Sequence, residues 1–81
     1  MKATIVRANS KREMFIFECE DGQIGYFEIL GGYDLETGDV VTGEFTGLGG
    51  ETLENVQTGE ELDVFIQDYC TYDMACKMVF R

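Results

Sequence analysis

The sequence predicts an all-β protein, a small antiparallel barrel of five to seven strands, and three observations support this fold class. Residues 14–30 contain two runs rich in aromatic and β-branched residues, joined by Asp21-Gly22, which is the pattern of a β-hairpin. Apolar residues lie on both faces of this ribbon at its open end. Glycines inside the predicted strands, at Gly25 and Gly43, are typical of the bends and bulges that let a sheet close into a barrel.

Asp21-Gly22 predicts a two-residue loop in a type I′ turn, because both central residues of that turn need a positive φ. This loop places Cys19 opposite Ile24 and Phe17 opposite Tyr26, and opposed residues share a face. One face then carries, apart from Glu28, only apolar side chains: Phe15, Phe17, Cys19, Ile24, Tyr26 and Leu30. The other face is polar near the turn and apolar at the open end, where it carries Met14, Ile16, Phe27 and Ile29. We therefore expect both faces of that end to be covered.

Four further segments are predicted as strands: residues 2–7, 39–46, 51–57 and 62–69. The last one alternates well, with Leu62, Val64 and Ile66 on one side and Asp63, Phe65, Gln67 and Tyr69 on the other. Polar segments with turn residues separate these strands. The longest of them, residues 31–38, has room for one helical turn at most.

Two structures fit residues 71–81. In a short helix, Thr71 would be the N-cap, with Asp73 in the first turn and Lys77 near the end, where the helix dipole favours each charge. The buried stripe would then be Met74, Ala75, Met78 and Val79. The same residues alternate equally well as a strand, and the aromatic and β-branched residues among them favour the strand.

Three strands in a meander, a polar connection and then further strands with internal glycines resemble the oligonucleotide/oligosaccharide-binding (OB) barrel. The resemblance covers strand order and the glycine bends, and an SH3-like barrel is the alternative. An OB barrel implies single-stranded nucleic-acid binding, here through Tyr26 and Phe27 together with the basic residues Arg7, Lys11 and Arg12.

The charge of the chain argues against nucleic acid as a partner. Sixteen acidic and six basic residues, without histidine, give a net charge of −10, and such a field repels phosphates instead of releasing their counterions. A partner that uses electrostatics is then a basic one. We interpret Arg7, Lys11 and Arg12 as a solvated loop whose charges relieve the acidic surface.

The 81 residues predict one domain, residues 1–81. The amino terminus does not resemble a signal peptide, and no apolar run approaches the roughly 18 residues of a membrane span. We therefore expect a cytoplasmic protein that does not bind membranes. The three cysteines, Cys19, Cys70 and Cys76, have no framework spacing and are interpreted as free thiols in a reducing compartment.

No catalytic, cofactor or metal site is predicted. Without histidine there is no base of the usual kind at neutral pH, and a Ser or Cys nucleophile lacks its ordinary partner. The acidic cluster Asp34, Glu36 and Asp39 lacks the calcium-loop pattern, and the cysteine spacing matches no common zinc motif. We therefore expect a protein that is not an enzyme.

The aromatic residues are the best functional signal, because they exceed what the lumen of one small barrel can hold. The predicted binding surface consists of Tyr26, Phe27, Tyr33, Phe45, Tyr69 and Tyr72. Exposed aromatics can form a partner surface, cap the barrel ends or make a homodimer interface. We predict an interaction module that binds a protein partner or itself; the alternative is OB-type single-strand binding or mimicry of DNA by the acidic surface.

Overall fold

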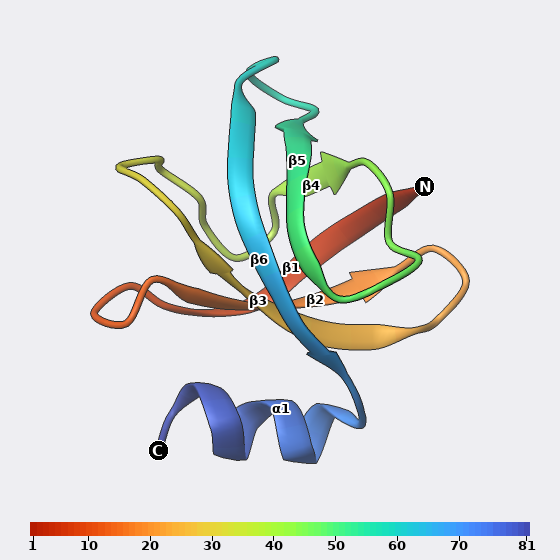
Figure 1. Ribbon diagram of the computed structural model, residues 1–81, viewed down its shortest axis with the longest axis vertical. Coiled ribbons are helices and arrows are strands. Elements are labelled where there is room, and N and C mark those ends of the chain that lie inside the picture. Colours follow the sequence, from red (N-terminus) through yellow and green to blue (C-terminus); the bar gives the residue numbers. More distant parts are fainter.

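The computed structural model describes residues 1–81 and contains six strands and one helix. The elements are β1 (Lys2–Asn9), β2 (Met14–Cys19), β3 (Ile24–Ile29), β4 (Val40–Thr42), β5 (Gly49–Asn55), β6 (Glu61–Tyr69) and α1 (Tyr72–Val79). The strands form a closed barrel in the order β1-β2-β3-β6-β5-β4, and every neighbouring pair is antiparallel. The predicted fold class, a small antiparallel barrel, is confirmed. In Figure 1, α1 lies below the strands and the β5–β6 hairpin rises above them.

The barrel consists of two meanders, β1-β2-β3 and β4-β5-β6. They are joined where β3 pairs with β6 and where β1 pairs with β4. The second meander is uneven, because β4 has three residues and pairs only with Asn55 and Glu54 of the much longer β5.

The β2–β3 loop differs from the predicted two-residue turn. The amide of Cys19 donates to the carbonyl oxygen of Gln23 at 2.8 Å, so residues 20–22 form a three-residue loop. Gly22 has a φ of +92°, whereas Asp21 is not among the residues with positive φ, which excludes a type I′ turn. A three-residue loop that ends in a residue with positive φ is the next most common hairpin connection. The carboxylate of Asp21 accepts a hydrogen bond from the amide of Gln23 at 3.0 Å, which stabilises the loop.

The extra loop residue moves the β2–β3 register by one position. Phe15 lies opposite Phe27, and Phe17 lies opposite Gly25. A shift of one residue exchanges the two faces of a strand, so the predicted face assignment of β3 was wrong. Phe27 points into the barrel and Tyr26 points outward, and Glu28 no longer interrupts the apolar face.

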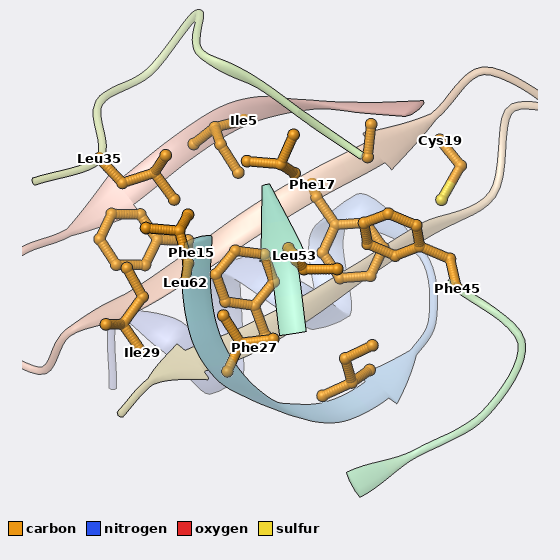
Figure 2. Packing of buried hydrophobic residues seen from close by; sticks show 14 residues of the cluster. Ile5, Phe15, Phe17, Cys19, Phe27, Ile29, Leu35, Phe45, Leu53 and Leu62 are labelled. Carbon is orange, nitrogen blue, oxygen red and sulfur yellow. The ribbon is translucent and has the colours of Figure 1, made fainter. Parts of the chain in front are cut away.

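Fourteen buried residues fill the lumen, and aromatic rings form its centre (Figure 2). The Phe17 ring stacks on Phe27 at 5.6 Å between centroids, and the Phe15 ring lies 5.8 Å from that of Phe27. Phe45 covers one end of the lumen at 5.0 Å from Phe17, while Leu35 lies toward the other end. Aromatic contacts of this kind add to the free energy gained by burial.

Helix α1 covers the outer side of the hairpin. Met14, Ile16 and Tyr26 project outward from β2 and β3 and are buried against Ala75 and Val79 of the helix. The open end of the ribbon is thus apolar and covered on both faces, as predicted.

The preference for a strand over residues 71–81 was wrong, and the helical alternative is the observed one. The Thr71 hydroxyl accepts a hydrogen bond from the amide of Met74 at 3.2 Å, as expected for an N-cap. Of the predicted stripe, Ala75 and Val79 are fully buried, whereas Met74 is exposed. The helix is more stable here than a strand because its apolar stripe packs on an apolar patch of β2 and β3 that the barrel leaves uncovered.

The end of α1 is held by the turn after β1. The Arg12 guanidinium donates to the carbonyl oxygens of Met78 and Val79 at 2.9 and 3.2 Å. The side-chain amide of Asn9 donates to the same Val79 oxygen at 2.8 Å. A cation at the last carbonyls also complements the helix dipole. Arg12 therefore has a structural role, and the interpretation of this turn as a simply solvated loop was incomplete.

Candidate functional site: an acidic face around Leu30 and Phe65

Half of the predicted aromatic surface lies inside the protein. Phe27 and Phe45 are 0 % and 3 % exposed within the lumen, and Tyr26 is 6 % exposed beneath α1. These three side chains therefore offer no surface to a partner. The causes differ: the one-residue register shift turns Phe27 into the lumen, α1 covers Tyr26, and Phe45 closes one barrel end.

The other three predicted residues lie in separate places. Tyr33 packs against the core at the barrel end that carries Leu35. Tyr69 packs edge-on against Phe17, toward the opposite end, and burial raises the pKa of its hydroxyl. Tyr72 is exposed on α1. Tyr33 and Tyr69 lie at opposite ends of the barrel and Tyr72 lies on the surface of α1, so the three do not form one binding surface.

A different pair of apolar side chains is exposed on the outer surface of β3, β6 and β5. Phe65 of β6 is 43 % exposed, and Leu30, directly after β3, is 47 % exposed. The amide of Leu30 donates to the carbonyl oxygen of Asp63 at 2.8 Å, which holds Leu30 beside β6. Phe65 pairs with Gly50 of β5, where no side chain stands, and a Cβ at that position would meet no atom within 4 Å.

An open depression of about 570 Å³ lies on this surface. Its lining residues come from β5, β6 and the end of β3: Leu30, Gly50, Glu51, Thr52, Asp63 and Val64. The Thr52 hydroxyl donates to the Asp63 carboxylate at 3.1 Å. We name the surface formed by Glu28, Leu30, Gly50, Thr52, Glu54, Glu61, Asp63 and Phe65 the acidic face.

Carboxylates surround the two apolar side chains of the acidic face. Glu28 lies opposite Phe65 across the β3–β6 pair. Glu54 and Glu61 lie directly opposite each other at the far end of the β5–β6 pair, an arrangement that destabilises a sheet. A partner cation placed near that pair would relieve the repulsion.

The basic residues are segregated from this face. All six lie in residues 2–12 and 77–81, and all sixteen acidic residues lie between Glu13 and Asp73. The fold brings the two basic segments together, because Arg7 donates to the Cys76 sulfur at 3.4 Å and Arg12 contacts the end of α1. Arg7 and Arg12 thus lie beside α1, which itself carries Lys77, whereas β5 and β6 contain no basic residue.

Like Arg12, Arg7 contacts α1 and the residues that follow it. Its guanidinium carbon lies 4.2 Å from the centroid of the Phe80 ring, a cation–π arrangement. The hydrogen bond with Cys76 is the largest cause of the raised pKa of Arg7. Two of the three residues of the predicted basic loop therefore hold the helix in place.

Neither the cysteines nor the acidic loop forms a metal site. All three cysteines are free thiols, and no group of three or more Cys, Asp and Glu side chains is arranged to hold a metal ion. In the loop before β4, the Asp39 carboxylate instead accepts a hydrogen bond from the amide of Glu36 at 2.9 Å. The one helix is too short and too polar to cross a membrane.

The pKa of the Cys19 thiol leads to a test of the closed barrel. Burial, reinforced by the nearby Asp21 carboxylate, raises this pKa from 9.0 to about 11. The folded protein therefore holds the proton more tightly than the unfolded chain, so stability is lost as the pH rises from about 9 to about 11. We expect Cys19→Ala to reduce the drop in the urea midpoint between about pH 8 and about pH 10.5.

The control for this test is Cys76→Ala, which changes a half-buried thiol on the helix. Comparing the pH-dependent drop within each protein cancels the loss of packing that either substitution causes. An alkaline drop of the same size in Cys19→Ala and the unmodified protein would contradict the buried position of this thiol.

The acidic face was missed at the sequence level, although one signal pointed to it. Phe65 lies between Asp63 and Gln67 on the polar side of its strand, and a large aromatic side chain on a polar face is exposed if that face meets water.

Comparisons of the chain with protein-family models, curated proteins and solved structures find no match. The fold and its surface thus define a small closed β-barrel with a segregated acidic face.

Proposed function

We propose that this protein is a non-enzymatic interaction module that binds a basic protein partner on the acidic face. The single observation that carries the proposal is the exposure of Leu30 and Phe65 beside an open depression on a face without a basic side chain. Exposed aromatic and aliphatic groups surrounded by charges are typical of protein-binding surfaces.

The two parts of the face have different physical roles. Aromatic anchors near the centre of an interface supply most of the binding energy, and Phe65 is placed for this beside the bare position of Gly50. The surrounding carboxylates, such as Glu28 and Asp63, steer a basic partner and increase its association rate. Binding should therefore weaken as salt is added, since exposed charges are screened.

The charge distribution favours a different protein over a second copy of this chain. A symmetric dimer contacts itself through the same patch on both subunits. On the acidic face it would bring Asp63 and the Glu54–Glu61 pair against their own copies, and like charges across an interface are costly. We therefore propose a heterologous partner.

Of the two nucleic-acid alternatives, only DNA mimicry retains support. Direct single-strand binding would need aromatic rings as stacking platforms, but Phe27 is buried and Arg7 and Arg12 hold α1. The net charge of −10, with no basic residue from position 13 to position 76, is compatible with mimicry. A mimic binds a DNA-binding protein, so double-stranded DNA should displace it from its partner.

Photo-crosslinking from the acidic face tests the proposal. A benzoylphenylalanine residue at position 65 should crosslink one basic protein in the cells of origin, and the yield should fall with added salt. With that protein purified, Phe65→Ser should weaken binding by about thirty-fold, which corresponds to a hot-spot residue. The physical reason is the loss of the aromatic anchor.

Tyr72 provides the matched control, because it is exposed to a similar degree but lies on α1. A crosslinker at position 72 should give no adduct with that protein, and Tyr72→Ser should bind as the unmodified protein does. Equal adducts from both positions, or no adduct from position 65, would overturn the proposed function.

A further inference from the structure

A second hollow lies at the barrel end that carries Leu35. This cavity has a volume of about 340 Å³, which falls within the range of small-molecule sites. The turn after β1, the start of β2, the end of β3 and the segment before β4 form its walls. It shares no lining residue with the depression on the acidic face and is more enclosed than that depression. The cavity is therefore a separate candidate site.

The floor of the cavity is one end of the hydrophobic core. Phe15, Ile29 and Leu35 line the cavity and belong to the cluster that fills the lumen. Figure 2 shows these side chains together at the end of the lumen opposite Phe45. Leu35 is the most exposed member of the cluster, at 7 %. An apolar group placed in the cavity would thus contact core side chains and leave water, which is favourable.

Tyr33 contributes an aromatic wall to the cavity. Its side chain is half-buried and packs against the core cluster. The ring also lies close to the backbone at Gly31, where a Cβ would be 3.0 Å from it. These contacts hold the ring in place beside the cavity. An aromatic ring held in this way attracts a cation that lies over its face.

The charged side chains of the cavity are both acidic. Glu13 and Asp34 line it, and no lysine or arginine does. Both residues are exposed, which places their carboxylates at the rim and not in the apolar floor. The rim is therefore complementary to a cation and repels an anion.

The backbone of Glu13 is fixed at this rim in an unusual conformation. Its φ is +56°, the only positive value outside glycine, and few residues with a side chain adopt such a value. The Glu13 amide donates to the carbonyl oxygen of Ser10 at 3.3 Å, and the Glu13 carbonyl oxygen accepts from the amide of Ile29 at 2.9 Å. Because the backbone is already ordered, less entropy is lost when the side chain binds a ligand.

We propose that this cavity binds a small organic amine. The apolar part of the amine lies on the floor formed by Phe15, Ile29 and Leu35. Its cationic nitrogen lies at the rim, where Glu13 and Asp34 attract it and the Tyr33 ring adds a cation–π contact. This site goes beyond the proposed function, because it uses another surface of the molecule and a ligand of another kind.

Nuclear magnetic resonance titration of the intact protein with 2-phenylethylamine tests this inference. This probe has one ring for the floor and one ammonium group for the rim. We expect a dissociation constant on the order of 1 mM, as is typical of so small a ligand. Nuclear Overhauser contacts should join its ring protons to the methyl groups of Leu35 and Ile29.

Two analogues of the probe separate the charge from the ring. The neutral 2-phenylethanol has nearly the same shape and should bind about fivefold more weakly, because it loses the attraction of exposed carboxylates. The anionic 3-phenylpropanoate should not bind, since both rim carboxylates repel it.

Charge-removing variants test the two rim residues. Glu13→Gln and Asp34→Asn should each weaken binding of the amine about threefold and leave binding of 2-phenylethanol unchanged. Glu36→Gln is the matched control, because it removes one charge from the same segment but does not line the cavity. It should leave both affinities unchanged. All three side chains are exposed, so these substitutions do not threaten the fold.

Three outcomes would overturn the amine site. They are the absence of binding by 2-phenylethylamine, equal binding of the amine and the alcohol, and equal weakening by Glu13→Gln and Glu36→Gln. Overhauser contacts to Leu30 in place of Leu35 and Ile29 would move the amine to the acidic face and would also overturn it. The proposed function is judged separately, by crosslinking from position 65.

Discussion

Replacing Phe27 with alanine should lower the free energy of unfolding by about 3–5 kcal/mol. Its ring is fully buried between Phe17 and Phe15, at centroid distances of 5.6 and 5.8 Å. Truncation removes the transfer free energy of the ring and leaves a cavity in a closed lumen that cannot easily collapse. Urea denaturation, with an unchanged slope and a lower midpoint, measures the loss.

Phe65→Ala is the matched control, because the same truncation is made at a ring that remains 43 % exposed. We expect a loss of no more than about 1 kcal/mol there, in the range of partly exposed positions. This pair of variants also tests the β2–β3 register. A negligible loss at Phe27 would indicate that it lies on the outer face, as a two-residue turn requires.

Gly25→Val should destabilise the protein by about 3 kcal/mol, at the upper end of the range for overpacking. A Cβ at this position would lie 2.5 Å from the carbonyl oxygen of Asp68 and 2.8 Å from the Phe17 ring. The β3–β6 register shifts at the following residues, between Tyr26 and Phe27, so the backbones approach closely at the predicted bend. Thermal unfolding followed by circular dichroism should show a lower midpoint.

Gly32→Val is the control for this substitution. Position 32 is exposed, its φ is not positive, and a Cβ there would meet no atom within 4 Å. The change should alter stability by no more than about 0.5 kcal/mol. Similar losses at both positions would show that the general cost of replacing glycine, and not the close approach to Asp68, determines the result.

Much of the fold follows from signals that depend on near neighbours. Alternating residues and the Asp21-Gly22 step predicted the β2–β3 hairpin. Apolar groups on both faces of its open end predicted that both faces would be covered. Gly25 marked the position of a real irregularity. These features could be inferred because turn chemistry and side-chain alternation act over a few residues.

The register of the hairpin depended on the rest of the barrel. An Asp-Gly step is compatible with a two-residue or a three-residue loop, and both bury several apolar residues of β2. The observed loop puts Phe27 in the lumen and leaves Glu28 outside, whereas the alternative directs the Glu28 carboxylate inward. Burying an unpaired carboxylate is costly, so the closed lumen favours the longer loop.

The location of the candidate site could not be inferred for the same reason. Aromatic content predicted that some rings would be exposed, but the identity of those rings depends on register and on what α1 covers. Tyr26 is buried only because the helix packs over it, and Phe65 is exposed because no element covers its side of β6.

The sequence by itself determined the class of fold, the central hairpin, the acidic character and the expectation of a basic partner, since these depend on composition and short-range pattern. The tertiary structure alone decided the loop length, the helix at residues 71–81 and the exposure of Leu30 and Phe65. In each of these cases, interactions between near neighbours in the chain leave the alternatives close in free energy. Contacts between residues far apart in the chain, such as those of Ile16 with Val79, provide the free energy that selects one.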